Sequence, residues 1–229
     1  MRLRVLMYHS ISADGTRDDL TVSKEQLEGH FQYLQARGYT SIGLSELVAY
    51  HKGRGALPPK PVLLTFDDGF ANNYELAYPL AKKYGIKINL FLVPGFILRG
   101  GYRDQRCMGR EEISRMDPGI VEFGLHSFTH QSYAELSLAQ AEADIQLCKQ
   151  YMEGAGIAYQ PCFAYPYGAY KDALFDRLEK QGIALAFRIG NRLNRLPLRH
   201  PFVVQRCDVR GDESFLSFRR GLRFGKKWI

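Results

Sequence analysis

The chain has 229 residues, of which 45% are hydrophobic and 24% are charged, and its formal net charge is +7. This composition is typical of a globular protein with one sizeable core, and its apolar runs are too short for a membrane-spanning helix or a signal peptide. We therefore expect one domain over residues 1–229, located in the cytoplasm, with no signal peptide or transmembrane segment.

Stretches typical of strands and helices alternate along the chain. In chain order they predict strand 2–9, helix 24–38, strand 39–42, helix 46–53, strand 62–66, helix 73–85, strand 87–93, helix 109–116, strand 121–127, helix 137–156, strand and turn 162–168, helix 170–182, strand 184–189, strand 202–209 and helix 213–223. Ser23 and Ser45 are the expected N-caps of the first two helices.

Strands that alternate with helices over some 220 residues indicate parallel βαβ units. About seven strands, with no Gly-x-Gly-x-x-Gly after the first, favour a barrel over an open dinucleotide-binding sheet. Barrel active sites gather at the carboxyl ends of the strands. Four predicted strands end in chemical groups: His9, the pair Asp67 and Asp68, His126, and the turn 165–168.

The stretch "PVLLTFDDGF", residues 61–70, places two carboxylates side by side after a buried strand. Such a pair is unfavourable unless a cation offsets its charge. His126 and His130 lie four residues apart and would share one face if the strand turned into a helix there. Two histidines and one carboxylate are a common hydrolytic zinc set, which indicates that one aspartate binds a metal.

The second aspartate is then placed to act as a base toward a metal-bound water, and a histidine at another strand end could act as the acid. Simpler interpretations exist for each group alone. Asp68 and the following glycine could form an ordinary turn, and His9 could be a hydrogen-bonded core histidine. Together, the motifs favour a catalytic site.

At these residues the chain resembles the NodB-like polysaccharide deacetylases, carbohydrate esterase family four. The motifs that carry the resemblance are "TFDDG", "HSFTH" and "AYPYG", and it extends over essentially the whole chain. It implies an α/β fold, a distorted (β/α)7 barrel, and metal-dependent removal of N-acetyl groups from N-acetylhexosamine units of a glycan or glycolipid. It also implies an N-acetylated glycan or lipid-linked sugar as the substrate.

The resemblance implies a role for each matching residue. Asp67 is the expected base, Asp68, His126 and His130 are the expected metal ligands, and the backbone N–H of Tyr167 is expected to stabilise the oxyanion. The cofactor is expected to be a divalent ion, Zn²⁺ first, although this ligand set also accepts Co²⁺, Ni²⁺ or Fe²⁺.

Two departures from the family pattern affect these assignments. Ala164 stands where the third motif usually has an arginine that orients the base, and Arg206 on the last strand is a candidate substitute. The acid histidine could be His200, in "LRH", or His9, in "VLMYHSI". We choose His9 because it ends a predicted strand, an arrangement that resembles the permuted biofilm poly-N-acetylglucosamine deacetylases.

Other functions remain open on the sequence. A non-catalytic glycan-binding module would account for Ala164, an O-acetyl esterase would use the same groups, and a non-haem iron oxygenase would use the same ligand types. Phe70, Tyr165 and Tyr167 could pack in the core or stack on a sugar.

Basic residues are concentrated in the last quarter of the chain. From residue 171 onward there are 14 Lys/Arg and 6 Asp/Glu, and the basic segment covers about 213–229. This segment could be a solvated helix or a peripheral contact with an anionic membrane surface. We expect no nucleic-acid partner, because no known binding motif accompanies the charge. The four cysteines are widely spaced and are expected to be reduced thiols.

Overall fold

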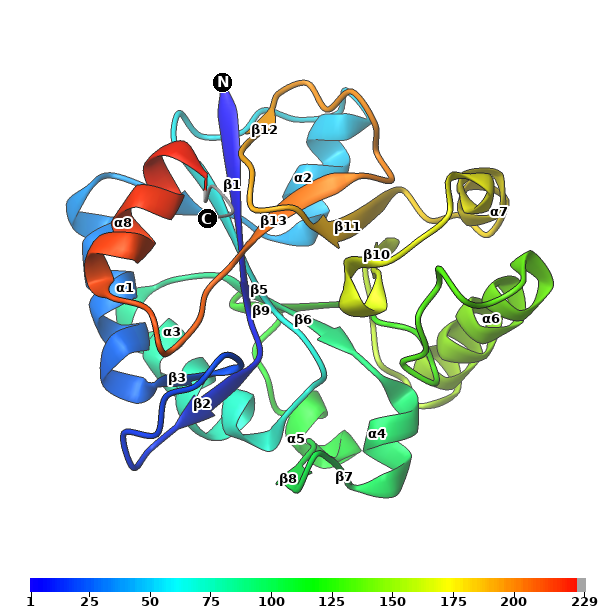
Figure 1. The fold of residues 1–229 in the computed structure, drawn as a ribbon, viewed down its shortest axis with the longest axis horizontal. Coiled ribbons are helices and arrows are strands. Elements are labelled where there is room, and N and C mark those ends of the chain that lie inside the picture. The colour runs from blue at the N-terminus through cyan, green and yellow to red at the C-terminus, as the bar shows by residue number, and fades with distance from the viewer. Residues whose placement is uncertain (226–229) are drawn as a thin grey trace.

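Seven parallel strands close into a barrel in the computed structural model, which describes residues 1–225 (Figure 1). In chain order the barrel strands are β1 (Arg2–Tyr8), β5 (Pro61–Phe66), β6 (Ile88–Leu92), β9 (Val121–Leu125), β10 (Cys162–Ala164), β11 (Leu185–Ile189) and β13 (Val204–Asp208). The barrel closes because β1 pairs in parallel with β13 on one side and with β5 on the other. The expected single-domain (β/α)7 barrel is confirmed.

The interior of the barrel is apolar at one end and charged at the other. Val5, Leu63 and Val204 belong to one buried cluster inside the strands. Because side chains alternate along a strand, Asp67 continues the face that carries Leu63, and Arg206 continues the face that carries Val204. The alternation thus places a carboxylate and a guanidinium inside the barrel, at its carboxyl end.

Helices surround the barrel. Their bounds are α1 (Lys24–Ala36), α2 (Leu44–His51), α3 (Tyr78–Tyr84, preceded by a π-helical turn Asn73–Ala77), α4 (Pro94–Arg99), α5 (Arg110–Ser114), α6 (Leu138–Gly154), α7 (Phe175–Lys180) and α8 (Phe215–Phe224). The helix α1 begins as expected, since the Ser23 hydroxyl accepts the backbone N–H of Gln26 and the Gln26 side chain accepts that of Ser23.

The expected cap at Ser45 is wrong. The helix α2 begins at Leu44, so Ser45 lies in its first turn. The Ser45 backbone N–H donates to the Glu122 carboxylate on β9 at 2.7 Å, and the N–H of Gly43 donates to Glu46 at 2.8 Å. Two carboxylates therefore satisfy the free N–H groups that a serine cap would otherwise serve.

Several short elements were not anticipated. The helix α4 and the hairpin of β7 (Gly101–Tyr102) and β8 (Gln105–Arg106) follow β6. Another pair, β2 (Ser10–Ser12) and β3 (Thr21–Ser23), follows β1. Finally, β12 (Asn194–Arg195) pairs antiparallel with β1. The strand predicted over 39–42, by contrast, is confirmed as β4 (Thr40–Ser41), which pairs with β5.

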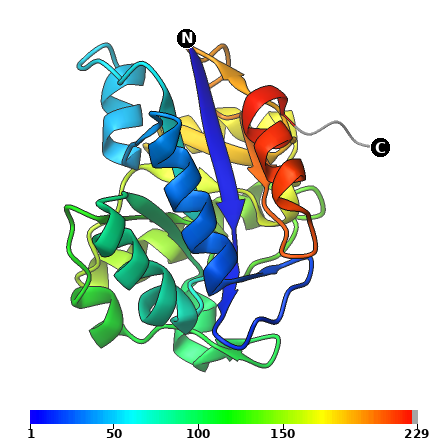
Figure 2. The same ribbon diagram turned by 90° about the vertical axis from the view of Figure 1, so that its left-hand side faces the viewer.

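The last described helix lies beside the first strand. In Figure 2, α8 and α1 flank β1. This helix confirms the helix predicted over 213–223, while residues 226–229 of the basic segment lie outside the described residues. All four cysteines are free and buried. Among residues 1–225, no helix is both long enough and apolar enough to cross a membrane.

Candidate active site

A cavity of about 160 Å³ opens at the carboxyl end of the barrel. It collects the groups that the sequence places at four strand ends: His9 after β1, Asp67 and Asp68 after β5, His126 after β9, and Tyr165 and Tyr167 after β10. His130 and Arg206 line the same cavity.

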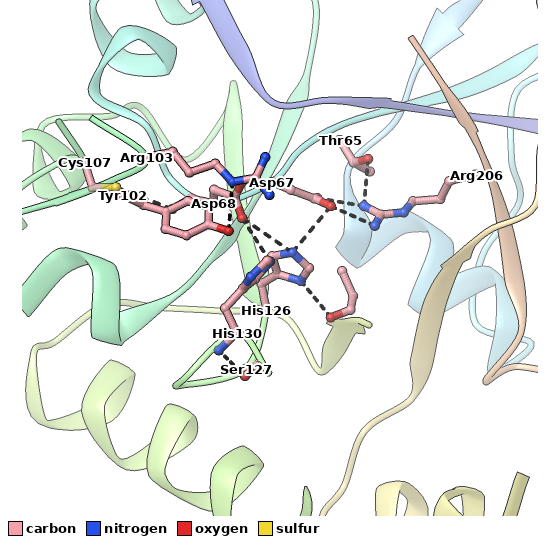
Figure 3. Close-up of polar contacts among 11 residues, drawn as sticks. Thr65, Asp67, Asp68, Tyr102, Arg103, Cys107, His126, Ser127, His130 and Arg206 are labelled. Carbon is pink, nitrogen blue, oxygen red and sulfur yellow. Dashed lines mark hydrogen bonds and ion pairs between the residues drawn. The ribbon is translucent and has the colours of Figure 1, made fainter. Parts of the chain in front are cut away.

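Asp67 is held by a guanidinium from the other side of the barrel. Nη1 of Arg206 donates to Oδ1 of Asp67 at 2.7 Å, and Nη2 donates to Oδ2 at 2.7 Å (Figure 3). Both side chains are almost fully buried, with 1% of Arg206 and 2% of Asp67 exposed. Nη1 also lies 3.4 Å from Oγ1 of Thr65, two residues before the aspartate. A bidentate contact of this kind fixes the plane of the carboxylate.

This pairing keeps Asp67 ionised. Burial by itself would raise the pKa of Asp67, but the neighbouring Arg206, together with His126, more than offsets it and lowers the pKa to about 2. Ala164 has no side chain that could orient this carboxylate, and Arg206 contacts it from β13 instead.

Three candidate ligand atoms converge beside this pair. One atom each from Asp68, His126 and His130 lies within 4.8 Å of the others. Oδ1 of Asp68 is 3.3 Å from Nε2 of His130 and 3.7 Å from Nε2 of His126. Atoms bound at 2.0–2.2 Å to a tetrahedral zinc ion lie about 3.3–3.6 Å from one another, so these separations suit a metal.

The hydrogen bonds of the three residues also fit a metal. Oδ1 of Asp68 is buried and has no hydrogen-bond partner within the described chain. Nδ1 of His126 lies 2.8 Å from the carbonyl oxygen of Ala164, an arrangement in which Nδ1 carries the proton and Nε2 keeps its lone pair. The three side chains can therefore hold a divalent cation without rearrangement of their partners.

The electrostatics of these residues favour the same interpretation. Burial, followed by the charge of Asp67, raises the pKa of Asp68 to about 8, so an anionic Asp68 needs a positive neighbour. Burial lowers the pKa of His126 to about 4 and that of His130 to about 3, which leaves both imidazoles neutral at pH 7. Neutral imidazole is the form that binds metals.

The two histidines meet through a loop, and the helical turn considered at this point does not form. Residues 126–130 form an irregular segment with a bend at 128–129, and Ser127 and His130 take left-handed backbone angles with φ of 71° and 63°. The Ser127 hydroxyl accepts the backbone N–H of His130 at 2.8 Å and closes the loop. The imidazole centroids lie 4.9 Å apart.

The loop is anchored from α6 by Asp144, which is 6% exposed. Its carboxylate accepts four hydrogen bonds: the backbone N–H groups of Phe128 and Thr129 at 2.9 and 3.0 Å, the Thr129 hydroxyl at 2.6 Å and the Tyr133 hydroxyl at 2.7 Å. Asp144 thus binds the segment that lies between the two histidines. Asp144 was not among the residues predicted from the sequence, although an acidic side chain on the buried face of an amphipathic helix was a usable signal.

The structure separates the two candidate acids. His9 lines the cavity, and its carbonyl accepts a hydrogen bond from the Asn73 amide at 2.8 Å. Burial lowers the pKa of His9, and the nearby Asp67 acts in the opposite direction. His200 is exposed and does not line the cavity. The geometry therefore favours His9.

Aromatic and basic groups form the rim. The Tyr167 side chain is 56% exposed, its ring centroid lies 4.9 Å from that of His130, and its backbone is left-handed with φ of 60°. From the unanticipated hairpin, Arg103 and Tyr102 also line the cavity, and Nε of Arg103 donates to the Tyr102 hydroxyl at 3.1 Å (Figure 3). Phe70 is buried and does not line the cavity, so packing explains it, whereas Tyr165 is buried but lines the cavity.

Comparison with known proteins assigns the family. The sequence profile of the polysaccharide deacetylases matches residues 54–186, more than half of the chain. The Bacillus subtilis protein YxkH, named as a member of that family, is 29% identical over 79% of this chain and 62% of its own length. Poly-beta-1,6-N-acetyl-D-glucosamine N-deacetylase of Staphylococcus aureus is 26% identical over 75% of this chain and 62% of its own length. The chain thus spans about three fifths of these relatives.

Solved structures show the same fold. The Streptococcus pyogenes deacetylase PplD superposes with a TM-score of 0.85 at 19% identity and covers 97% of this chain and 98% of its own. IcaB from Ammonifex degensii gives a TM-score of 0.83 at 24% identity over 97% of this chain and 96% of its own. The chain belongs to the polysaccharide deacetylase family.

Proposed function

We propose that this chain is a metal-dependent hydrolase that removes N-acetyl groups from N-acetylhexosamine units of a glycan or glycolipid and releases acetate. The observation that carries the proposal is a single buried cavity that holds the Asp67–Arg206 pair, three candidate metal ligands and His9. The names of the Staphylococcus aureus relatives support N-acetylglucosamine as the sugar. The catalytic domain in this proposal is residues 1–229, with the basic segment about 213–229.

The metal in this proposal is held by Asp68, His126 and His130. A divalent ion there would polarise the acetyl carbonyl and lower the pKa of a bound water. Zinc is the first candidate, and cobalt, nickel and iron suit the same ligands.

The remaining groups handle protons and orientation. Asp67 accepts a proton from the attacking water, while Arg206 keeps its carboxylate ionised and in one plane. The backbone N–H of Tyr167 donates to the developing oxyanion. His9 gives a proton to the sugar nitrogen as the C–N bond breaks. The products are acetate and a free amine.

The glycan-binding alternative rested on Ala164 alone. Arg206 now contacts the carboxylate that the missing arginine would orient, so this reason for doubting catalysis is removed. An O-acetyl esterase would use the same groups, and the choice between the two reactions belongs to the substrate test.

The test is acetate release from N-acetylglucosamine oligomers by metal-reconstituted protein. The set comprises wild type, Asp67→Asn, His9→Ala and, as the matched control, His200→Ala. We expect Asp67→Asn and His9→Ala each to lose a factor of about 10²–10⁴ in kcat, because each removes an acid–base group, while His200→Ala stays near wild type.

Chelation should abolish activity and a divalent ion should restore it. Full activity after complete metal removal would overturn the metal-dependent mechanism. An equal loss in His9→Ala and His200→Ala would overturn the choice of acid. Acetate release from acetylated xylan but not from N-acetylglucosamine oligomers would assign an O-acetyl esterase instead.

A further inference from the structure

A second cavity, of about 470 Å³, lies away from the active-site cavity, between α8, the end of α1 and the starts of β1 and β5. Its cationic lining consists of Arg4, Arg37, Lys60, Arg219, Arg220 and Arg223. We call this the basic groove. Arg4 is near the amino end of β1 and Lys60 immediately precedes β5, so the groove lies toward the end of the barrel opposite the catalytic groups.

Within the described part of the chain, the positive charges of the basic groove have no carboxylate partner. Among residues 1–225, none of the six forms an ion pair with a carboxylate. Elsewhere on the surface, Arg106 shows the paired case, since it contacts Glu75 and Glu112 at 2.6 and 2.8 Å. Uncompensated like charges in one concave site create a positive potential that attracts an anion.

Aromatic rings and a backbone carbonyl group contact several of these cations and hold them in position. The guanidinium of Arg4 lies 5.1 Å from the Tyr39 ring, and its Nε donates to the carbonyl of Leu222 at 3.0 Å. The guanidinium groups of Arg37 and Arg219 lie 5.3 and 5.4 Å from the Tyr33 ring. The cations are therefore partly positioned before a ligand arrives, which reduces the entropy lost on binding.

Exposed apolar side chains border the same groove. On α8, Leu216 is 52% exposed and Phe224 is 67% exposed. Another face of α8 is well anchored, since Phe218 and Phe215 both stack on His30, with ring centroids 3.7 and 6.0 Å from it; in Figure 2, α8 and α1 lie on either side of β1. Leu216 and Phe224 also line the groove together with the arginines.

We propose that the basic groove and the exposed side chains of α8 bind the surface of an anionic phospholipid bilayer. Lipid phosphates would occupy the groove, and Leu216 and Phe224 would enter the headgroup region. A soluble polyanion satisfies the cations but gives no reason for exposed leucine and phenylalanine beside them, so the combination favours a bilayer. In this orientation the active-site cavity faces away from the lipid. A variant can therefore lose membrane binding and keep its deacetylase activity.

The test is co-sedimentation of the full chain with vesicles of phosphatidylcholine alone or with about 30% phosphatidylglycerol. We compare wild type with Arg219→Gln/Arg223→Gln and with the control Lys24→Gln/Lys52→Gln. The control changes net charge equally at exposed lysines outside the groove. We expect binding only to anionic vesicles, a loss of at least about tenfold in the groove variant, and a change of less than about twofold in the control.

A second variant tests the apolar part. Leu216→Ser/Phe224→Ser should weaken vesicle binding about tenfold and leave binding to soluble polyphosphate unchanged, because only the bilayer accepts the apolar side chains. Acetate release by each variant from a soluble oligomer should equal that of wild type and shows that the fold is intact. Three results would each overturn the proposal. They are no binding to anionic vesicles, equal losses of binding in the groove and control variants, and vesicle binding that is unchanged in Leu216→Ser/Phe224→Ser.

Discussion

The candidate site has two halves, the proposed base and the proposed metal ligands. One buried charged side chain supports each half, but the two side chains do so in different ways. Arg206 contacts the carboxylate of Asp67 directly, since Nη1 and Nη2 each donate to one of its oxygens at 2.7 Å. Asp144 contacts neither histidine, and instead accepts hydrogen bonds from the loop between them. One residue sets the charge and plane of a proposed base, and the other sets the shape of a proposed metal loop.

The difference separates chemistry from assembly. A change at Arg206 alters the electrostatics of a proposed reacting group, because the pKa of Asp67 depends on that guanidinium. A change at Asp144 alters where His126 and His130 stand, and leaves the proposed base in place. Variants at the two positions should therefore differ in which measurement they affect.

Arg206→Met should have the largest effect on the free energy of unfolding. It leaves the Asp67 carboxylate buried without its partner, a change that costs about 3–5 kcal/mol. Burial then raises the pKa of Asp67, so the proposed base is less often ionised and kcat falls as well. Urea unfolding and acetate release measure the two consequences.

The control is the double variant Arg206→Met/Asp67→Asn. Removing the charge should return much of the lost unfolding free energy without returning activity, because the proposed base is now absent. A double variant no more stable than Arg206→Met would contradict the view that the unpaired carboxylate causes the loss. Arg206→Lys should also fall short of wild type, since an ammonium cannot donate two parallel hydrogen bonds.

Asp144→Asn should act on the metal instead. The amide nitrogen cannot accept a hydrogen bond, so the loop loses part of its anchor and metal affinity should fall about 10–100-fold. A titration against a competing chelator measures this. At saturating metal, kcat should return to within a few-fold of wild type, which distinguishes Asp144 from Arg206.

Glu142→Gln is the matched control, because Glu142 lies on the same helix and pairs only at the surface, with Nη1 of Arg177 at 2.9 Å. It should leave metal affinity unchanged. Should Asp144→Asn bind metal as tightly as Glu142→Gln, the anchoring role of Asp144 would be wrong.

The sequence predicted the metal half of the site by residue type, but its local geometry was out of reach. The spacing of His126 and His130 fits a helix as well as a loop, so the loop could not be chosen. Its formation depends on left-handed backbone angles at Ser127 and His130, which non-glycine residues rarely adopt and which leave no mark in the sequence.

The base half shows a different kind of difficulty. Arg206 lies 139 positions from Asp67, and only the closure of β13 against β1 and β5 brings the two together. The sequence could offer Arg206 as a substitute at Ala164 because both belong to barrel strands, but it could not supply the register. The elements missed entirely, such as α4 and the hairpin after it, are too short to show a periodic pattern.

Thr129→Val is the smallest change that tests the comparison. It removes one of the four hydrogen bonds to Asp144, the one from the hydroxyl at 2.6 Å, and keeps the backbone N–H bond from the same residue at 3.0 Å. A single hydrogen bond contributes about 1 kcal/mol, which corresponds to roughly a fivefold loss in metal affinity. Because the carboxylate remains bound to Phe128 and Tyr133, the loop should keep its shape.

In the background of Asp144→Asn the same substitution should have a smaller effect, since the two groups act through one contact. Losses that simply add would show that Thr129 and Asp144 support the loop independently.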